Sequence, residues 1–135
     1  MAINKNLSSA EYFYNNNDLE AAKKICKTIL IDDNQDLNAL DLITKINIKQ
    51  ENFEEALKYS NLSISKEDKN YNTYFIRSLI YQRLKKSDEA LESLDKVIEL
   101  NKSHAESYNL KAIIYEGLGN DEKALENWDN AIKIK

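Results

Sequence analysis

The chain has 135 residues, a net charge of −4 at pH 7 and a pI of about 5.1. Hydrophobic residues make up 42% of it and charged residues 31%, which is the balance of a folded protein, and the length suits a single domain over residues 1–135. The acidic balance and the lack of a lysine- or arginine-rich block remove the electrostatic attraction on which nucleic-acid binding depends, so no nucleic-acid partner is expected.

The N-terminal segment has no apolar run that could serve as a secretion signal, and no stretch approaches the length of a transmembrane helix. We therefore expect a cytoplasmic protein that does not insert into membranes. Proline is absent and glycine occurs only twice, so the tight turns that a β-sheet needs have few candidates. The composition predicts an all-α fold.

A regularly spaced alanine runs through the whole chain. It occurs as Ala22, Ala56, Ala90 and Ala124, each 34 residues after the one before, with no insertion between them. A fixed period of this length is typical of helical solenoids, in which each repeat is a helical hairpin that stacks on its neighbours.

The period and the residues around it resemble the tetratricopeptide repeat (TPR) family, whose 34-residue unit has large and small residues at fixed positions. Aligning the recurring alanine with the small residue of the second helix gives four units, residues 3–36, 37–70, 71–104 and 105–135. The resemblance covers essentially the whole chain. It implies an all-α, right-handed α-solenoid of four TPR helix-turn-helix units.

The four units differ in how well they match the family pattern. The first has Asn6 at a position where a large residue is usual, and the second is the most degraded, with Asn47, Ser60 and Ser63 where bulk or alanine is usual. The third and fourth units match best, through Tyr74, Ser78, Tyr81, Ala90, Leu94 and Val97, and through Tyr108, Ala112, Tyr115, Gly119, Ala124, Trp128 and Ala131.

Helix starts are predicted from residues that can cap a helix. Residues 84–87 break the periodic pattern and supply a candidate N-cap within the third unit, and Asn52 with Glu55 and Ser103 with Glu106 have the spacing of a capping box. The turns between units lack the proline that the family usually has. We expect Asp and Asn side chains to form those turns, as in residues 32–34 and 68–70.

No group of residues in the sequence assembles a catalytic or metal site, so we expect a protein that is not an enzyme and has no cofactor. The lone histidine, His104, falls in a turn and is interpreted as solvated, and Cys26 is expected to be an inert buried thiol. The acidic pairs at 32–33, 54–55 and 88–89 are interpreted as solvated residues at helix ends where carboxylates favour the helix dipole.

Eight tyrosines could suggest a ligand cage, but their helical spacing favours packing for most of them. Tyr14 is the exception, because its position in the first unit is expected to face the groove.

The TPR resemblance implies that the first helix of each unit lines a concave surface that binds a peptide. The positions that commonly contact a peptide hold Asn4, Leu7, Ser8, Glu11, Tyr14, Asn15, Asn38, Asp41, Leu42, Lys45, Ile48, Lys49, Asn72, Phe75, Ile76, Leu79, Gln82, Arg83, Glu106, Asn109, Leu110, Ile113 and Glu116. The peptide-binding residues that we select from them are Leu7, Tyr14, Asp41, Lys45, Phe75, Leu79, Gln82, Arg83, Asn109 and Ile113.

TPR domains that bind the acidic C-terminal tails of chaperones use a clamp of Lys and Asn residues. The equivalent positions here hold Leu7, Glu11, Leu42, Asn72 and Ile76 in one register and Asp41, Lys45, Ile76, Glu106 and Leu110 in the other. Without convergent cations a terminal carboxylate would be desolvated and unpaired, so such tails are not the expected partner. Phe75, Leu79 and Ile113 instead suit a segment with apolar anchors, although Phe75 and Leu79 could also simply support neighbouring helices.

The last helix of the fourth unit carries an apolar stripe of Leu125, Trp128 and Ile132, and no capping helix follows in the sequence. We expect this stripe to support self-association, with a homodimer as the simplest outcome, unless Trp128 folds back over its own hairpin. Two functions therefore stay open. One is an adaptor that binds a peptide or a helical segment of a partner protein in the concave TPR groove; the other is a self-associating scaffold.

Overall fold

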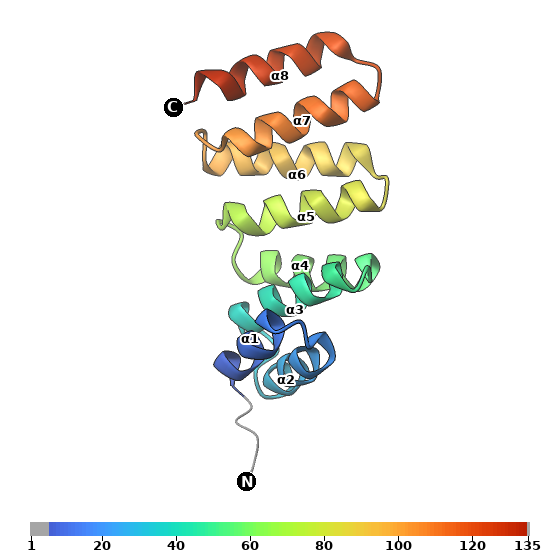
Figure 1. Ribbon diagram of the computed structural model, residues 1–135. Coiled ribbons are helices and arrows are strands. Elements are labelled where there is room, and N and C mark those ends of the chain that lie inside the picture. Colours follow the sequence, from blue (N-terminus) through green and yellow to red (C-terminus); the bar gives the residue numbers. More distant parts are fainter. Residues whose placement is uncertain (1–5, 135) are drawn as a thin grey trace. The chain divides into compact units, whose positions relative to one another are not determined.

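In the computed structural model, residues 6–134 are described, and within that range the chain forms eight helices and no strand (Figure 1). The helices are α1 (Leu7–Asn15), α2 (Leu19–Asp32), α3 (Leu37–Lys49), α4 (Phe53–Lys66), α5 (Tyr71–Arg83), α6 (Ser87–Leu100), α7 (Ala105–Gly117) and α8 (Asp121–Lys133). Each unit predicted from the sequence holds two consecutive helices, so the helical hairpins are confirmed. Residues 3–5 of the first predicted unit, Asn4 among them, and the last residue of the fourth lie outside the described range. None of the described helices has both the length and the apolar character that crossing a lipid bilayer requires.

The described chain divides into two compact units, which are larger than the 34-residue repeats. Unit 1 ends at Asp68, and unit 2 begins at Lys69. In unit 1, α1 packs on α2, α3 packs on α4, and α2 also contacts α3. In unit 2, α5 packs on α6, α7 packs on α8, and α6 also contacts α7. Each unit therefore holds two hairpins, and the second helix of one hairpin contacts the first helix of the next.

The recurring alanine lies where the two helices of each hairpin approach each other. Ala22, Ala56 and Ala90 are fully buried and Ala124 is 1% exposed. A methyl side chain lets two helix backbones come close, whereas a larger side chain would force them apart. The packing role predicted from the spacing is confirmed.

The turn inside every hairpin uses one residue with left-handed backbone geometry. The φ angles are 62° at Asn17, 61° at Glu51, 60° at Lys85 and 78° at Gly119. These four residues are equivalent, since each follows the previous one by 34 positions. Glycine adopts this conformation at no steric cost, but Glu51 and Lys85 do not, so two hairpins contain strained turns.

The residue after each of these turns is the N-cap of the second helix. Asp18 and Asn120 accept hydrogen bonds from the backbone N–H groups of Ala21 (3.2 Å) and Lys123 (3.1 Å). Asn52 is an N-cap as predicted, but its side chain makes no capping hydrogen bond. The N-cap of α6 is Lys86, which lies within the predicted stretch 84–87, but its side chain has no acceptor and makes no capping hydrogen bond.

The turns between units use Asp and Asn side chains. Asp33 accepts from the backbone N–H of Gln35 at 3.0 Å, and Asn70 accepts from that of Asn72 at 3.0 Å, so the prediction for these turns is confirmed. The predicted cap at Ser103 is wrong, since the N-cap of α7 is His104.

The second hairpin buries unusually polar residues. The only buried residues of α4 are Ala56, Ser60 and Ser63. In α3, Asn47 is 1% exposed; its amide nitrogen donates to the carbonyl of Ile43 at 2.9 Å, and its Oδ1 has no hydrogen-bond partner among the described residues. A buried polar group without a partner costs about 1–3 kcal/mol, so Asn47 offsets part of the stability that the buried apolar residues of α3 contribute.

Candidate functional site

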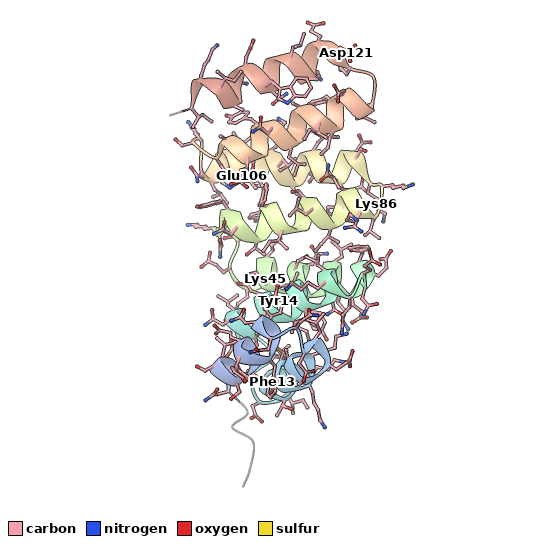
Figure 2. The ribbon with its side chains drawn as sticks, in the orientation of Figure 1. Phe13, Tyr14, Lys45, Lys86, Glu106 and Asp121 are labelled. Atoms are coloured by element: carbon pink, nitrogen blue, oxygen red, sulfur yellow. The ribbon has the colours of Figure 1, made fainter. Side chains whose placement is uncertain are left out.

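A pocket of about 310 Å³ lies between α1 and α3 in unit 1. Its lining residues recur at helical spacing, so they come from one face of each helix. They are Leu7, Glu11, Tyr14 and Asn15 from α1, and Asn38, Asp41, Leu42 and Lys45 from α3. All eight belong to the concave set expected from the sequence, and four of them, Leu7, Tyr14, Asp41 and Lys45, are among the selected binding residues. Figure 2 labels Tyr14 and Lys45.

The apolar part of the pocket is fixed by the core of unit 1. Leu42 is 8% exposed and belongs to the buried cluster that also contains Ile25 and Cys26, while Leu7 and Tyr14 pack against that cluster from its edge. These side chains are therefore held in place by the packing of α2 and α3.

The polar part of the pocket is centred on Asp41. Its Oδ1 accepts a hydrogen bond from the hydroxyl of Ser63 on α4 at 2.9 Å. Burial raises the pKa of the Asp41 carboxyl, and the Ser63 hydrogen bond and the nearby Lys45 ammonium oppose that rise. The carboxylate is thus partly desolvated, and additional hydrogen-bond donors from a ligand would stabilise its ionised form.

The ring of Tyr14 interacts with the ammonium group of Lys49. The ammonium nitrogen of Lys49 lies 4.2 Å from the centroid of the Tyr14 ring, a distance suited to a cation–π interaction. Because Tyr14 also lines the pocket, it is positioned as the sequence analysis expected for the one tyrosine outside the packing pattern.

In unit 2 the selected residues differ in exposure. Ile113 is 52% and Leu79 is 37% exposed, whereas Phe75 is half-buried. Phe75 packs against the cluster of Ala90, Leu94 and Ile114, which is the supporting role left open by the sequence analysis. The polar members of the set are the half-buried Gln82 and the exposed Arg83 and Asn109.

Comparison with known proteins tests the resemblance to the TPR family. The family model described as "Tetratricopeptide repeat" matches residues 71–104 and 105–135, which are the third and fourth units predicted from the alanine spacing. This chain contains tetratricopeptide repeats.

Solved structures of MamA share the all-α solenoid fold of this TPR protein. One crystal structure of MamA has a TM-score of 0.91 with 18% sequence identity, and the match covers 94% of this chain and 74% of that one. A second has a TM-score of 0.88 with 19% identity over 93% of this chain and 68% of that one. A third, MamA 41-end from Desulfovibrio magneticus RS-1, has a TM-score of 0.89 with 12% identity over 97% and 76%. At these identities the likeness establishes the fold alone. No curated protein sequence matches the chain.

Outside the pocket, the side chains that could take part in chemistry are those of Cys26, His104 and the acidic pairs. Cys26 is fully buried, and burial together with the nearby Asp36 raises the pKa of its thiol to about 11, so the thiol stays protonated near neutral pH. Within residues 6–134, no group of His, Cys, Asp and Glu side chains could hold a metal ion.

His104 is not the solvated turn residue that the sequence suggested. It is half-buried, its Nδ1 lies 2.8 Å from the hydroxyl of Ser107, and its ring meets the rings of Phe75 (4.9 Å) and Tyr71 (5.4 Å) at steep angles. The histidine therefore helps to join α5 to the start of α7.

The interpretation of the acidic pairs holds for two of the three. Residues 54–55 and 88–89 lie in the first turns of α4 and α6, where negative charge is favourable. Asp32 and Asp33 instead end α2, the unfavourable end for a carboxylate, and the Asp33 side chain serves the following turn.

The stripe on α8 is less uniform than its spacing suggested. Leu125 is 61% and Ile132 is 78% exposed, whereas Trp128 is half-buried. The surface of α8 thus has two exposed aliphatic side chains, with the indole between them partly covered.

Sequence reasoning missed one residue of the pocket's support. Ser63 was noted only as an unusual small polar residue in the second repeat, yet its hydroxyl holds Asp41. That departure from the family pattern was the available signal.

Proposed function

We propose that this TPR protein is a non-enzymatic adaptor that binds a peptide or a helical segment of a partner protein on the concave faces of its first helices. The α1–α3 pocket would provide the anchor in unit 1. The family match supports a protein-interaction scaffold in general, and the pocket supports this more specific role.

The chemistry of the pocket suits a peptide. Asn15 and Asn38 make no side-chain hydrogen bond within the described residues, and their amides can both donate to and accept from a peptide backbone. Leu7 and Leu42 offer an apolar contact, and a volume of about 310 Å³ is enough for one large side chain with its backbone.

The cellular setting is part of the same proposal. A net charge of −4 disfavours nucleic acid and anionic membrane surfaces as partners, which leaves other proteins. We also propose a cytoplasmic location.

A selection with random peptides displayed on phage tests the proposal without knowledge of the native partner. Peptides enriched on the wild-type chain should bind at least tenfold more weakly to a variant carrying Glu11→Ala and Lys45→Ala, because both side chains line the pocket.

The matched control is Glu55→Ala with Lys58→Ala, which removes the same two charges from the exposed surface of α4 and should leave binding unchanged. Equal binding by both double variants, or a selection that enriches no peptide, would refute the assignment.

A self-associating scaffold is the second candidate, and the exposure of Leu125 and Ile132 on α8 favours it. In that case sedimentation equilibrium should give the mass of an oligomer, and Leu125→Glu with Ile132→Glu should reduce it to one chain. A wild type that stays monomeric at high concentration would contradict this candidate.

A further inference from the structure

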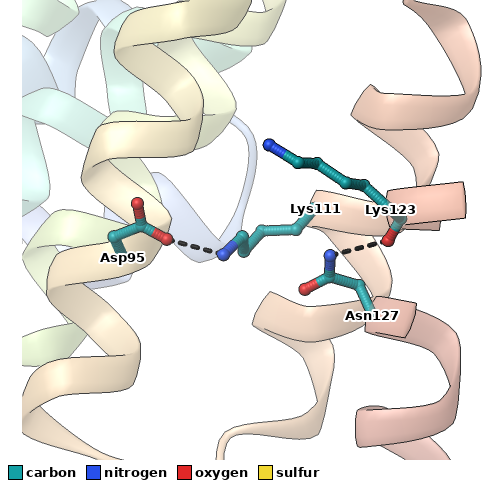
Figure 3. Close-up of polar contacts among 4 residues, drawn as sticks. All are labelled: Asp95, Lys111, Lys123 and Asn127. Carbon is teal, nitrogen blue, oxygen red and sulfur yellow. Dashed lines mark hydrogen bonds and ion pairs between the residues drawn. The ribbon is translucent and has the colours of Figure 1, made fainter. Parts of the chain in front are cut away.

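In unit 2, the second helix of one repeat, α6, packs on the first helix of the next repeat, α7, and this contact shows which side chains such a surface binds. Leu94 of α6 and Ile114 of α7 are buried together, and Leu91 and Leu110 pack against them from the two helices. Beside this contact, Lys111 of α7 donates to Asp95 of α6 at 2.6 Å (Figure 3). The interface thus combines aliphatic pairs with one ion pair.

The next second helix, α8, carries part of the same constellation 34 residues later, with the half-buried Trp128 in the place of the buried Leu94. Leu125, Asp129 and Ile132 are equivalent to Leu91, Asp95 and Ile98. Their exposures differ, because Leu91 and Ile98 are half-buried whereas Leu125 is 61% and Ile132 is 78% exposed.

Asp129 is also exposed, and it makes no ion pair with any residue in the part of the chain that is described. In contrast, its equivalent Asp95 is paired with Lys111. The outer face of α8, defined by Leu125, Asp129 and Ile132, is therefore exposed within residues 6–134, whereas the corresponding surface of α6 contacts α7.

We propose that the outer face of α8 binds an amphipathic helix of a partner protein, with aliphatic side chains at positions i and i+4 and a lysine or arginine at i+1. This is the arrangement of Leu110, Lys111 and Ile114 on α7. The aliphatic pair would cover Leu125 and Ile132, and the cation would pair with Asp129. This site goes beyond the peptide-binding role, since the pocket proposed for that role lies on α1 and α3.

The first helix of a second copy is a poor match for this surface. The residues of α1 equivalent to Leu110, Lys111 and Ile114 are Ser8, Ser9 and Tyr12. A serine would face the aliphatic surface, and Asp129 would gain no cation. The chemistry of the face favours a helix from a different protein over a second copy stacked through α1.

A peptide with the sequence of residues 105–118 serves as the probe, labelled with a fluorophore and bridged between positions 109 and 113 to hold it helical. Both bridged positions are exposed on α7, so the bridge leaves the contact residues free. Fluorescence anisotropy with the full chain should give saturable binding, at least tenfold tighter than with a scrambled peptide. Leu125→Glu with Ile132→Glu should weaken it by about tenfold or more.

A charge swap separates the proposed pairing from general hydrophobic adhesion. Asp129→Lys should weaken binding by about threefold to tenfold, and a peptide with Lys111→Glu should restore it on that variant. Glu126→Lys makes the same charge change one residue away from Leu125 and should leave binding unchanged.

Three results would overturn the proposal. They are binding no tighter than with the scrambled peptide, a charge swap without restoration, and a chain that already forms a dimer dissociated by Ile132→Glu, which would make a second copy the occupant. Peptides selected on phage for the α1–α3 pocket should still bind the α8 variants, so the two proposals can fail separately.

Discussion

Gly119→Ala tests the strained turn that recurs inside each hairpin. A Cβ added at Gly119 would meet no atom within 4 Å, so the cost of the substitution comes only from its φ of +78°. An L-residue in the left-handed region costs about 1–2 kcal/mol, and the reduced freedom of the unfolded chain offsets about 0.4–1 kcal/mol of that. We therefore expect Gly119→Ala to lower the free energy of unfolding by about 1 kcal/mol.

The reverse substitution at an equivalent turn should have the opposite sign. Lys85 has a φ of 60° and an exposed side chain, so Lys85→Gly should raise the free energy of unfolding by up to about 1 kcal/mol. Asn17→Gly should change it less, because asparagine tolerates this conformation better than lysine does.

Urea denaturation of the full chain followed by far-UV circular dichroism measures these differences. The control is Gly117→Ala, at the end of α7, where an added Cβ also meets nothing within 4 Å but the backbone is helical. That variant should be as stable as the wild type or up to about 1 kcal/mol more stable. If Gly119→Ala behaves like Gly117→Ala, or if Lys85→Gly gains nothing, the reasoning about the turns is wrong.

Three further substitutions test the packing, a helix cap and the pocket. Ala90→Leu should overpack the third hairpin and lower the free energy of unfolding by about 1–3 kcal/mol, and an unaltered melting temperature would count against the repeat register. Lys86→Asp should supply the N-cap acceptor that α6 lacks and raise the free energy of unfolding, measured by urea denaturation, by about 0.5–1.5 kcal/mol. If that free energy does not rise, residue 86 is not the N-cap. Asp41→Asn should raise the melting temperature at pH 7, because the raised pKa of Asp41 means that its ionised form destabilises the folded state. This rise in melting temperature should shrink as the pH falls from the raised pKa of Asp41 to the pKa of an ordinary Asp carboxyl, because the wild-type carboxyl is then protonated in the folded state. A rise that does not depend on pH would contradict this explanation.

The sequence was sufficient to predict the hairpins, because one period determines where every helix can lie. The alanine spacing located all four close helix approaches, and it gave the unit boundaries at residues 71–104 and 105–135 that the family model also has. Helix caps were less predictable. Ser87 and Ser103 have the right side chains, but the backbone starts α6 and α7 elsewhere: the left-handed turn at Lys85 places the cap of α6 at Lys86, and α7 starts after His104.

The pocket was predictable only in part. Helical spacing placed Leu7, Glu11, Asp41 and Lys45 on faces expected to line one surface, and these residues do line one pocket. The hydrogen bond from Ser63 to Asp41 depends on how closely α4 packs on α3, which no spacing rule specifies. For the same reason, the partial burial of His104 could not be deduced from its place in a turn.

The small buried side chains of α4 connect the local stability of this helix to the pocket. Ala56, Ser60 and Ser63 are its only buried residues, and its larger apolar side chains, such as Tyr59, are only half-buried, so α4 itself contributes few fully buried apolar groups and its amides should exchange with solvent through local opening. Each opening also removes the Ser63 hydroxyl from Asp41. Any ligand that requires Asp41 to be held in this way binds only the closed form, and it must therefore slow hydrogen exchange throughout α4. Occupancy of the pocket would thus be measurable on a helix that contributes no residue to its lining.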